Sequence, residues 1–274
     1  MFQLFHKVGG KTFLFVGLLT ILFASFLFHS PMTVHANALT SNGWAGYEAR
    51  GTRGTYTEVN TYFIVPALAP IVGTSVAIWA GVGSRIGATY PRELVQAGIA
   101  AFVDASTGIQ VNKAFWEVYG DGTTNTEQYF PQSVLSVQTG DLIWVYVTSN
   151  LDNSGQDYFI VEDTTTGKSA STTLKDIHAI TDGTAAECIA EDHLNVLTLS
   201  PKPLANFGTI LFSSCRVYGQ SKPHQGWLSI GNEQYNKLDM VRGSTTLATT
   251  SELLSGTYPG DGNSFTITWH NLGL

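Results

Sequence analysis

The sequence predicts an all-β protein, an antiparallel sandwich or barrel, and three observations lead to this fold class. Short segments rich in β-branched and aromatic residues recur along the chain, and Gly, Pro, Asn and Asp separate them. The tract Thr-Thr-Thr-Gly at residues 164–167 separates two of these segments as a hairpin turn would. Beyond the N-terminal leader, no segment carries an apolar helical stripe over three turns. Many short strands separated by turns are typical of antiparallel sandwiches and barrels.

The expected strands are short and follow one another closely. No internal repeat, interdomain linker or low-complexity tract interrupts them, so we expect one domain. The strands are expected at residues 56–65, 75–82, 93–104, 112–119, 141–149, 158–163, 168–174, 185–191, 207–217, 238–241 and 264–270.

The N-terminal leader has the order of features of a secretory signal peptide. Two lysines and no acidic residue precede an apolar stretch over residues 12–28, and Ala36-Asn37-Ala38 supplies a small-x-small cleavage site. A retained membrane anchor is the alternative, since about 17 apolar residues just span a thin bilayer. We expect cleavage, which gives a signal peptide at residues 1–38 and a mature domain at residues 39–274. The protein is then secreted, with no membrane association after cleavage.

The mature domain is acidic and poor in charge. Charged residues make up 13% of the chain, with 14 Lys+Arg against 21 Asp+Glu. Because both leader charges are lysines, the mature domain keeps 12 basic residues against 21 acidic ones, a formal net charge of −9. Nucleic acids and anionic membrane surfaces attract basic patches, so we expect neither as a partner. Because so few carboxylates can be protonated, the composition also favours an acid habitat.

The two cysteines, Cys188 and Cys215, leave two alternatives open. In an oxidising compartment they would form one disulfide, but the sequence does not show whether their Cα atoms approach each other. Two buried free thiols fit nearly as well. No Cys-x-x-Cys, His-Glu-x-x-His or Cys/His cluster occurs, so a metal site has little support.

Candidate chemistry lies in polar side chains within apolar strands, because the Gly-x-Ser-x-Gly, Asp-Thr-Gly and Asp-Ser-Gly motifs of common hydrolases are absent. Side chains alternate along a strand, so Gln96 shares one face with Leu94 and Gly98. An amide among apolar neighbours must be hydrogen-bonded. A purely structural bond to an adjacent strand would satisfy it as well as a catalytic role would.

Glutamates occupy two further strands. Glu187 and Glu191, four residues apart, lie on one face, and His193 follows in a chain otherwise poor in charge. A strand facing water would show the same pattern. Glu117 lies between two aromatic residues that share its face, which indicates either a cleft carboxyl with a raised pKa or a carboxylate paired with an arginine.

Taken together, these segments resemble the glutamic peptidase family, the eqolisins, and they follow the family's order along most of the mature chain. The segments with counterparts are Ser-Asn-Gly-Trp-Ala-Gly-Tyr at 41–47, Trp-Ala-Gly-Val-Gly at 79–83, Val-Gln-Ala-Gly at 95–98, Phe-Trp-Glu-Val-Tyr at 115–119, Gly-Asp at 140–141, Thr-Thr-Gly-Lys at 165–168, Ala-Glu-Cys-Ile-Ala-Glu-Asp at 186–192, Leu-Ala-Asn-Phe-Gly at 204–208 and Ser-Phe-Thr-Ile-Thr-Trp at 264–269.

The resemblance implies a sandwich of two antiparallel sheets, of the concanavalin-like or jelly-roll type. It implies a secreted acid endopeptidase that acts on polypeptide substrates as a monomer, without metal or cofactor. Glu191 would be the general base on water and later the proton donor, and Gln96 would stabilise the oxyanion. A carboxylate base with its ordinary pKa would work at about pH 3 to 4. The residues implied to line the substrate cleft are Trp44, Trp79, Glu117 and Tyr119.

The chain departs from the family pattern at three places. Gly43 interrupts the opening Asn-Trp pair, and Gly83 stands where fungal members have Asp. The fungal enzymes also carry a long pro-segment, whereas here the first family motif follows residue 38 almost at once, so we expect none.

Two other functions fit the same composition. A carbohydrate-binding sandwich would use its aromatic residues to stack on sugar rings. A glycoside hydrolase would use paired carboxylates such as Glu117 and Glu191, about 5 to 10 Å apart. A binding module has no reason to unite Gln96 and Glu191 in one cleft, so their placement discriminates between these functions.

Overall fold

The computed structural model describes residues 36–86, 94–120, 127–149, 155–175, 182–195, 200–220, 223–254 and 263–273. These residues belong to one compact unit, Val34–Leu274. Strands dominate this unit, and a single turn of 3-10 helix, Ile230–Asn232, interrupts them. Within the ranges given above, no helix is long and apolar enough to cross a membrane.

Eighteen strands are found in the described part of the chain. They are β1 (Ala36–Ser41), β2 (Trp44–Arg50), β3 (Tyr56–Ile64), β4 (Ser75–Gly83), β5 (Leu94–Val103), β6 (Gln110–Tyr119), β7 (Gln128–Tyr129), β8 (Leu142–Thr148), β9 (Gln156–Asp163), β10 (Lys168–Lys175), β11 (Ala185–Glu191), β12 (Leu194–Asn195), β13 (Ser200–Pro201), β14 (Thr209–Gly219), β15 (Gly226–Ser229), β16 (Gln234–Arg242), β17 (Thr245–Thr250) and β18 (Asn263–Trp269).

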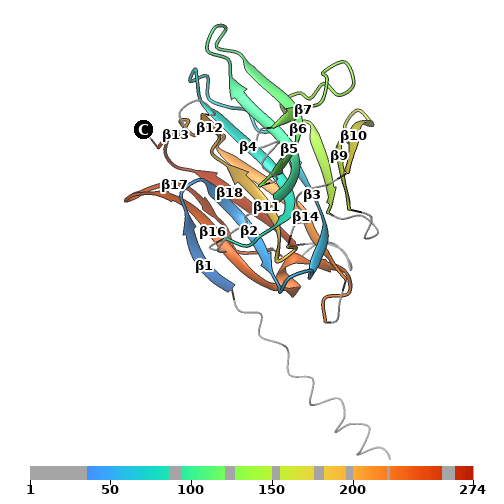
Figure 1. Cartoon of the computed structure of the whole chain (residues 1–274). Coiled ribbons are helices and arrows are strands. Elements are labelled where there is room, and N and C mark those ends of the chain that lie inside the picture. Colours follow the sequence, from blue (N-terminus) through green and yellow to red (C-terminus); the bar gives the residue numbers. More distant parts are fainter. Residues whose placement is uncertain are drawn as a thin grey trace, which may run out of the picture. The chain divides into compact units, whose positions relative to one another are not determined.

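Most of the strands form one hydrogen-bonded path that folds over into two layers (Figure 1). The path runs β10-β9-β8-β3-β14-β18-β17-β16-β2-β11-β4-β5-β6-β7. Strands from its first half contact strands from its second half: β3 lies against β4 and β11, and β8 lies against β4 and β5. Neighbours on the path are antiparallel, whereas β1 joins β16 in parallel. The all-β antiparallel sandwich is therefore confirmed.

The main hydrophobic core lies between the two layers and takes alternate residues from each strand. On β11, Ala186, Cys188 and Ala190 belong to this core. Ile189 points to the opposite face and joins a smaller apolar cluster with Trp79, Leu94, Phe115 and Leu238. The layer that contains β11 is thus apolar on both faces, and its outer face is the one that carries the candidate residues.

A disulfide joins the two layers. Cys188 of β11 bonds Cys215 of β14, with Cα atoms 6.6 Å apart, and both residues are fully buried. This settles the two alternatives that the sequence left open. The bond lies directly behind the face that carries Glu187 and Glu191, because side chains alternate along β11.

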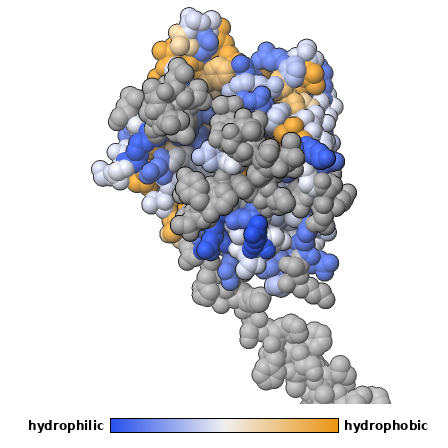
Figure 2. Space-filling model, viewed as in Figure 1, coloured by the Kyte–Doolittle hydropathy of each residue, from blue (hydrophilic) through white to orange (hydrophobic). Residues whose placement is uncertain are grey.

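The outer surface is mixed in character. Figure 2 shows that one face carries hydrophilic and apolar side chains side by side, with apolar areas in its upper part, over the β5–β6 hairpin. Ile109, in the turn of that hairpin, is 65% exposed.

Expected and observed strands agree closely in the middle of the chain and less well near its ends. The hairpin at residues 164–167 is present and joins β9 to β10. Strand β2 was not expected, because its sequence is rich in Ala, Gly and charged residues. Gly46 explains its presence: a Cβ atom there would lie 2.2 Å from the carbonyl oxygen of Cys188, so only glycine lets β2 approach β11.

Candidate active site

A row of polar residues crosses the outer face of the β2-β11-β4-β5-β6 layer. Strand register places Glu48 beside Glu187, Glu187 beside Gly81, Gly81 beside Gln96, and Gln96 beside Glu117. Directly paired residues of neighbouring strands point to the same face. Four polar side chains from four strands therefore share one face, and a glycine lies between the second and the third.

An apolar row lies next to the polar one and is centred on Trp79. It pairs Gly46, Ile189, Trp79, Gly98 and Phe115 across the same five strands. The glycine at position 98 is required by close approach, since a Cβ there would lie 2.0 Å from the carbonyl oxygen of Ile78. Trp79 is fully buried, so its ring can fill the space above the glycines of its neighbours.

Glu191 ends β11 and is held by two tryptophans. Trp79 Nε1 donates to Glu191 Oε2 at 2.8 Å, and the Trp44 side chain also hydrogen-bonds this carboxyl. Trp44 and Trp79 meet edge to face, with ring centroids 5.2 Å apart. Burial raises the pKa of Glu191 to about 7, although the two indole hydrogen bonds and the charge of His193 favour its ionised form.

Gln96 is bonded to Glu117 rather than to the backbone of an adjacent strand. Its Nε2 donates to Glu117 Oε2 at 2.6 Å. Its Oε1 is buried and has no hydrogen-bond partner among the described residues. Burial raises the pKa of Glu117 to about 7, and the charge of Glu191 contributes to that rise. The structure therefore places Gln96, Glu117 and Glu191 on one face in one site, and Glu117 has no arginine partner among the described residues.

The remaining expected cleft residues lie on the same face. Trp44 and Trp79 contact Glu191, as described above. Tyr119 lies one row beyond Glu117, opposite Leu94, and is 45% exposed, so it stands at the solvent side of the site. The glycine at position 83 is also opposite Leu94, in the row of Tyr119.

The inserted Gly43 does not displace Trp44. Gly43 lies in the bend between β1 and β2, where its carbonyl oxygen accepts the Asp192 N–H at 2.8 Å. The Trp44 N–H donates to Ser41 Oγ at 3.2 Å, and Trp44 pairs with Glu191 in the strand register. The extra residue is absorbed in the bend, and the indole keeps its place beside Glu191.

Sequence analysis missed an ion pair at the site. Glu127 precedes β7, and its Oε1 lies 2.5 Å from His193 Nε2. Tyr129 Oη donates to the other oxygen of Glu127 at 2.5 Å. The position of His193 after Glu191 was a signal in the sequence, but Glu127 stands in a polar stretch with no feature to single it out. Glu127 and His193 are brought together by the pairing of strands that are distant in the sequence.

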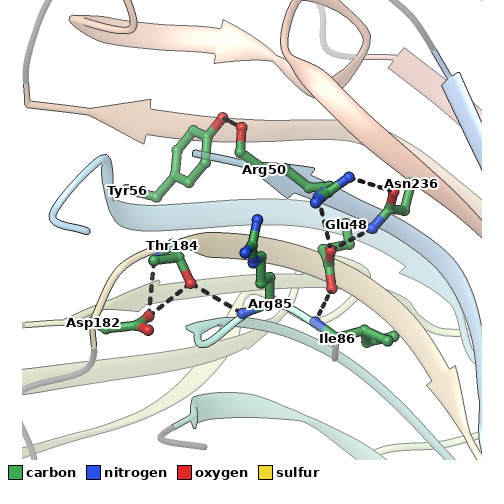
Figure 3. A network of polar contacts seen from close by, with 8 residues as sticks. All are labelled: Glu48, Arg50, Tyr56, Arg85, Ile86, Asp182, Thr184 and Asn236. Carbon is green, nitrogen blue, oxygen red and sulfur yellow. Dashed lines mark hydrogen bonds and ion pairs between the residues drawn. The ribbon is translucent and has the colours of Figure 1, made fainter. Parts of the chain in front are cut away.

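A second acidic pair, Glu48 and Glu187, lies further along the polar row, and Figure 3 shows the polar contacts of Glu48. Glu48 accepts hydrogen bonds at 2.7 Å from the Ile86 N–H and from Asn236 Nδ2, and Arg50 Nε lies 3.9 Å away. Burial raises the pKa of Glu48 to about 7. Glu187, its register partner, is fully buried, and neither of its carboxyl oxygens has a hydrogen-bond partner among the described residues. Burial and the charge of Glu48 therefore raise the pKa of Glu187 well above its usual value.

The donor set of the site does not resemble a metal centre. In the ranges that the structure describes, no group of three or more His, Cys, Asp or Glu side chains is arranged to hold a metal ion. The carboxyls are bonded instead to indoles, an amide and an imidazole.

Comparison with known proteins gives one family and several structural neighbours. A sequence model of the peptidase A4 family matches residues 42–258. Scytalido-glutamic peptidase, solved with a transition state analog inhibitor, is 19% identical with a TM-score of 0.66, covering 84% of this chain and 99% of its own. SCP-B, an eqolisin solved with the tripeptide Ala-Ile-His, is 18% identical with a TM-score of 0.62 and the same coverage.

Aspergilloglutamic peptidase from Aspergillus niger is 22% identical with a TM-score of 0.56, covering 72% of this chain and 99% of its own. No curated protein matches the chain. At these identities the structural likeness shows a shared fold, whereas the family match spans most of the chain.

The buried Glu187 predicts a stability that falls as pH rises. Below about pH 4.5 this carboxyl is protonated in both the folded and the unfolded chain. Above that pH the unfolded chain releases a proton that the folded chain retains, so the free energy of unfolding decreases until the folded pKa is passed. Glu187→Gln has no proton to release, so we expect its melting temperature near pH 7 to exceed that of the wild type by several degrees.

Thermal unfolding between pH 4 and pH 8 measures this difference. Glu252→Gln is the matched control, because the Glu252 side chain is 75% exposed and forms a surface ion pair with Lys237. Equal pH dependence in the wild type and in Glu187→Gln would contradict the interpretation.

Proposed function

The chain belongs to the peptidase A4 family, the glutamic peptidases, and on that premise we propose that it is a secreted endopeptidase whose catalytic dyad is Gln96 and Glu191. Membership makes it a peptide-bond hydrolase that acts on polypeptides. The finer assignments, which are the dyad, the export and the working pH, rest on the arguments that follow.

One observation supports the dyad: Gln96 and Glu191 lie on the same face of the layer, on strands that β4 separates, and both interact with Glu117. Glu117 connects them, since it accepts the Gln96 amide and its pKa responds to the charge of Glu191. This placement is what a peptidase requires, whereas a sugar-binding module would have no use for it.

The proposed reaction begins with a water molecule between the two side chains. The Glu191 carboxylate takes a proton from this water, and the resulting hydroxide attacks the scissile carbonyl carbon. One N–H of Gln96 is bonded to Glu117, which leaves its second N–H for the oxyanion and its unpartnered Oε1 for the water. Protonated Glu191 then gives its proton to the leaving nitrogen as the C–N bond breaks.

The working pH follows from the two buried carboxyls. Both Glu117 and Glu191 have a pKa raised to about 7, and two neighbouring carboxyls avoid being ionised together. The active form has Glu191 ionised and Glu117 protonated. Burial thus moves the proposed range from the pH 3 to 4 of an ordinary carboxyl to weakly acid solution, with a bell-shaped profile.

The first test removes each member of the dyad. Glu191→Gln eliminates the base, and we expect kcat/KM on a denatured protein substrate to fall by about 10²–10⁴. Gln96→Ala removes an oxyanion donor and should cost roughly 10²–10³ in kcat. The exposed Glu252→Gln variant should cleave at the wild-type rate. Full activity in either dyad variant would overturn the assignment.

The second test concerns the proton on Glu117. In Glu117→Gln the side chain is permanently neutral and still accepts from Gln96, so it imitates the protonated acid. We expect the alkaline limb of the kcat/KM profile to move to higher pH, while the acid limb, set by Glu191, stays in place. The pH profile of the variant against wild type measures this, and an unchanged alkaline limb argues against a functional proton on Glu117.

Two features support the proposal that the protein is exported: the N-terminal leader and the disulfide. Residues 1–35 lie outside the described part of the chain, and the Cys188–Cys215 bond favours an oxidising compartment. Cleavage after Ala38 would leave Leu39–Ser41 of β1 paired with Leu238–Met240 of β16. We propose a monomer outside the cell that begins at Leu39. N-terminal sequencing of the exported protein should find this residue first, and an intact leader would contradict the proposal.

A further inference from the structure

The Glu127–His193 ion pair spans the site. His193 follows β11 by two residues, and Glu127 immediately precedes β7, with β4, β5 and β6 between these strands. Four strand spacings correspond to about 19 Å in a flat sheet. The two side chains nevertheless meet at 2.5 Å, and both residues lie in segments that adjoin the strands rather than within them. The strands that the pair bridges are those that carry Trp79 and Gln96.

Backbone contacts fix His193 in place. The Lys202 N–H donates to the His193 carbonyl oxygen at 2.8 Å, and the Asp192 N–H donates to the Gly43 carbonyl oxygen at 2.8 Å. The Asp192 carboxylate also forms an ion pair with Arg242. Asp192 and His193 are adjacent in the chain, and each is anchored by a backbone hydrogen bond. These bonds hold the imidazole of His193 near Glu191 and against Glu127.

We propose that His193 is a positioning residue that acts through Glu191: clamped by Glu127, its imidazolium supplies a positive charge that favours the ionised form of the Glu191 carboxyl. This inference rests on the proposed function, because it gives His193 a role only if Glu191 is the base. The arrangement is a chain of alternating charges, Glu127 negative, His193 positive and Glu191 negative.

Glu127 is needed because burial alone works against an imidazolium. Burial lowers the pKa of His193, but the Glu127 carboxylate outweighs this effect, and the pKa of His193 is raised. Burial raises the pKa of Glu127, yet the His193 charge and hydrogen bond outweigh it, and the pKa of Glu127 is lowered. Both partners therefore remain charged over the weakly acid range in which Glu191 must act.

In the described part of the chain, three further charged groups interact with His193. Glu117 of β6 and Asp192, next to His193 in the chain, are both stabilised as anions by its charge. Lys202, which follows β13, opposes the imidazolium and lowers the pKa of His193. Among these groups Glu191 is the only member of the proposed dyad, so the effect of His193 on catalysis is expected through that carboxyl.

The experiment measures the acid limb of kcat/KM and, separately, the ionisation of Glu191. His193→Gln should move the acid limb up by about one pH unit, as loss of a neighbouring opposite charge does. His193→Lys restores a positive charge and should return most of the shift. His270→Gln is the matched control, because His270 is exposed and its imidazole, among the described residues, is hydrogen-bonded to the Thr249 hydroxyl. Carbon-13 NMR of the glutamate carboxyls, with Glu191 assigned from the Glu191→Gln variant, follows the same titration without substrate.

Each outcome decides one question. An upward shift in both readouts, reversed by His193→Lys, supports the inference. An acid limb and a Glu191 titration unchanged in His193→Gln overturn it, even if Glu191→Gln is inactive. Full activity of Glu191→Gln overturns the proposed function instead, and the NMR titration then still shows whether His193 controls the charge of Glu191. Near-ultraviolet circular dichroism verifies that each variant is folded, and a shift in His193→Gln that the lysine variant fails to reverse counts against the role of charge.

Discussion

The burial of carboxyl groups on an apolar sheet face is the constraint on which the rest of this site depends. An ionised carboxyl taken out of water without partners is so costly that the group takes up a proton instead. The outer face of the β2-β11-β4-β5-β6 layer buries Glu48, Glu187 and Gln96 in one row and leaves Glu117, in the same row, and Glu191, nearby, only partly exposed. Each of these groups must be hydrogen-bonded, paired with an opposite charge or protonated. Which of the three applies to each group determines the chemistry of the site.

Glycines make this burial possible. Gly46 and Gly98 let β2 and β5 approach their neighbours where any Cβ would collide with the backbone. Trp79 is the large side chain in the row that contains these two glycines. At Gly81 a Cβ would lie 2.9 Å from the Leu94 side chain and 3.1 Å from the Trp79 ring, which is closer than van der Waals contact allows. The indole therefore occupies room that the glycines leave, and from there its N–H reaches Glu191. The Cys188–Cys215 disulfide lies on the opposite face of β11, the strand that carries Glu191.

Period-two alternation was enough to predict which face each candidate takes. Leu94 and Phe115 lie in the outer apolar cluster with Gln96 and Glu117 between them, while the alternate residues Val95 and Val118 lie in the main core, as the sequence predicts. Alternation says nothing of which strands are neighbours. The bond between Glu127 and His193 and the register of Glu48 with Glu187 join segments far apart in the chain. Neither pair has a local signal, so neither was predicted.

Glu187 and Glu191 show how neighbours divide one strand into two kinds of acid. They lie on the same face of β11, four residues apart, and in both cases burial favours the protonated form. Glu187 receives no hydrogen bond from the described residues and faces another carboxyl, Glu48, so it is suited to remain neutral. Glu191 receives two indole N–H groups and lies near an imidazolium, all of which favour its anion.

Environments that push the ionisation of two similar groups apart are how proteins assign acid and base roles. The hydrogen-bond donors around each of the two glutamates support the proposal of Glu191 as the base, and this support does not depend on any family resemblance. Glu187, four residues earlier on the same face, then has a different consequence: while it is protonated it adds no second buried charge beside Glu191, and its own contribution to stability is largest in acid solution.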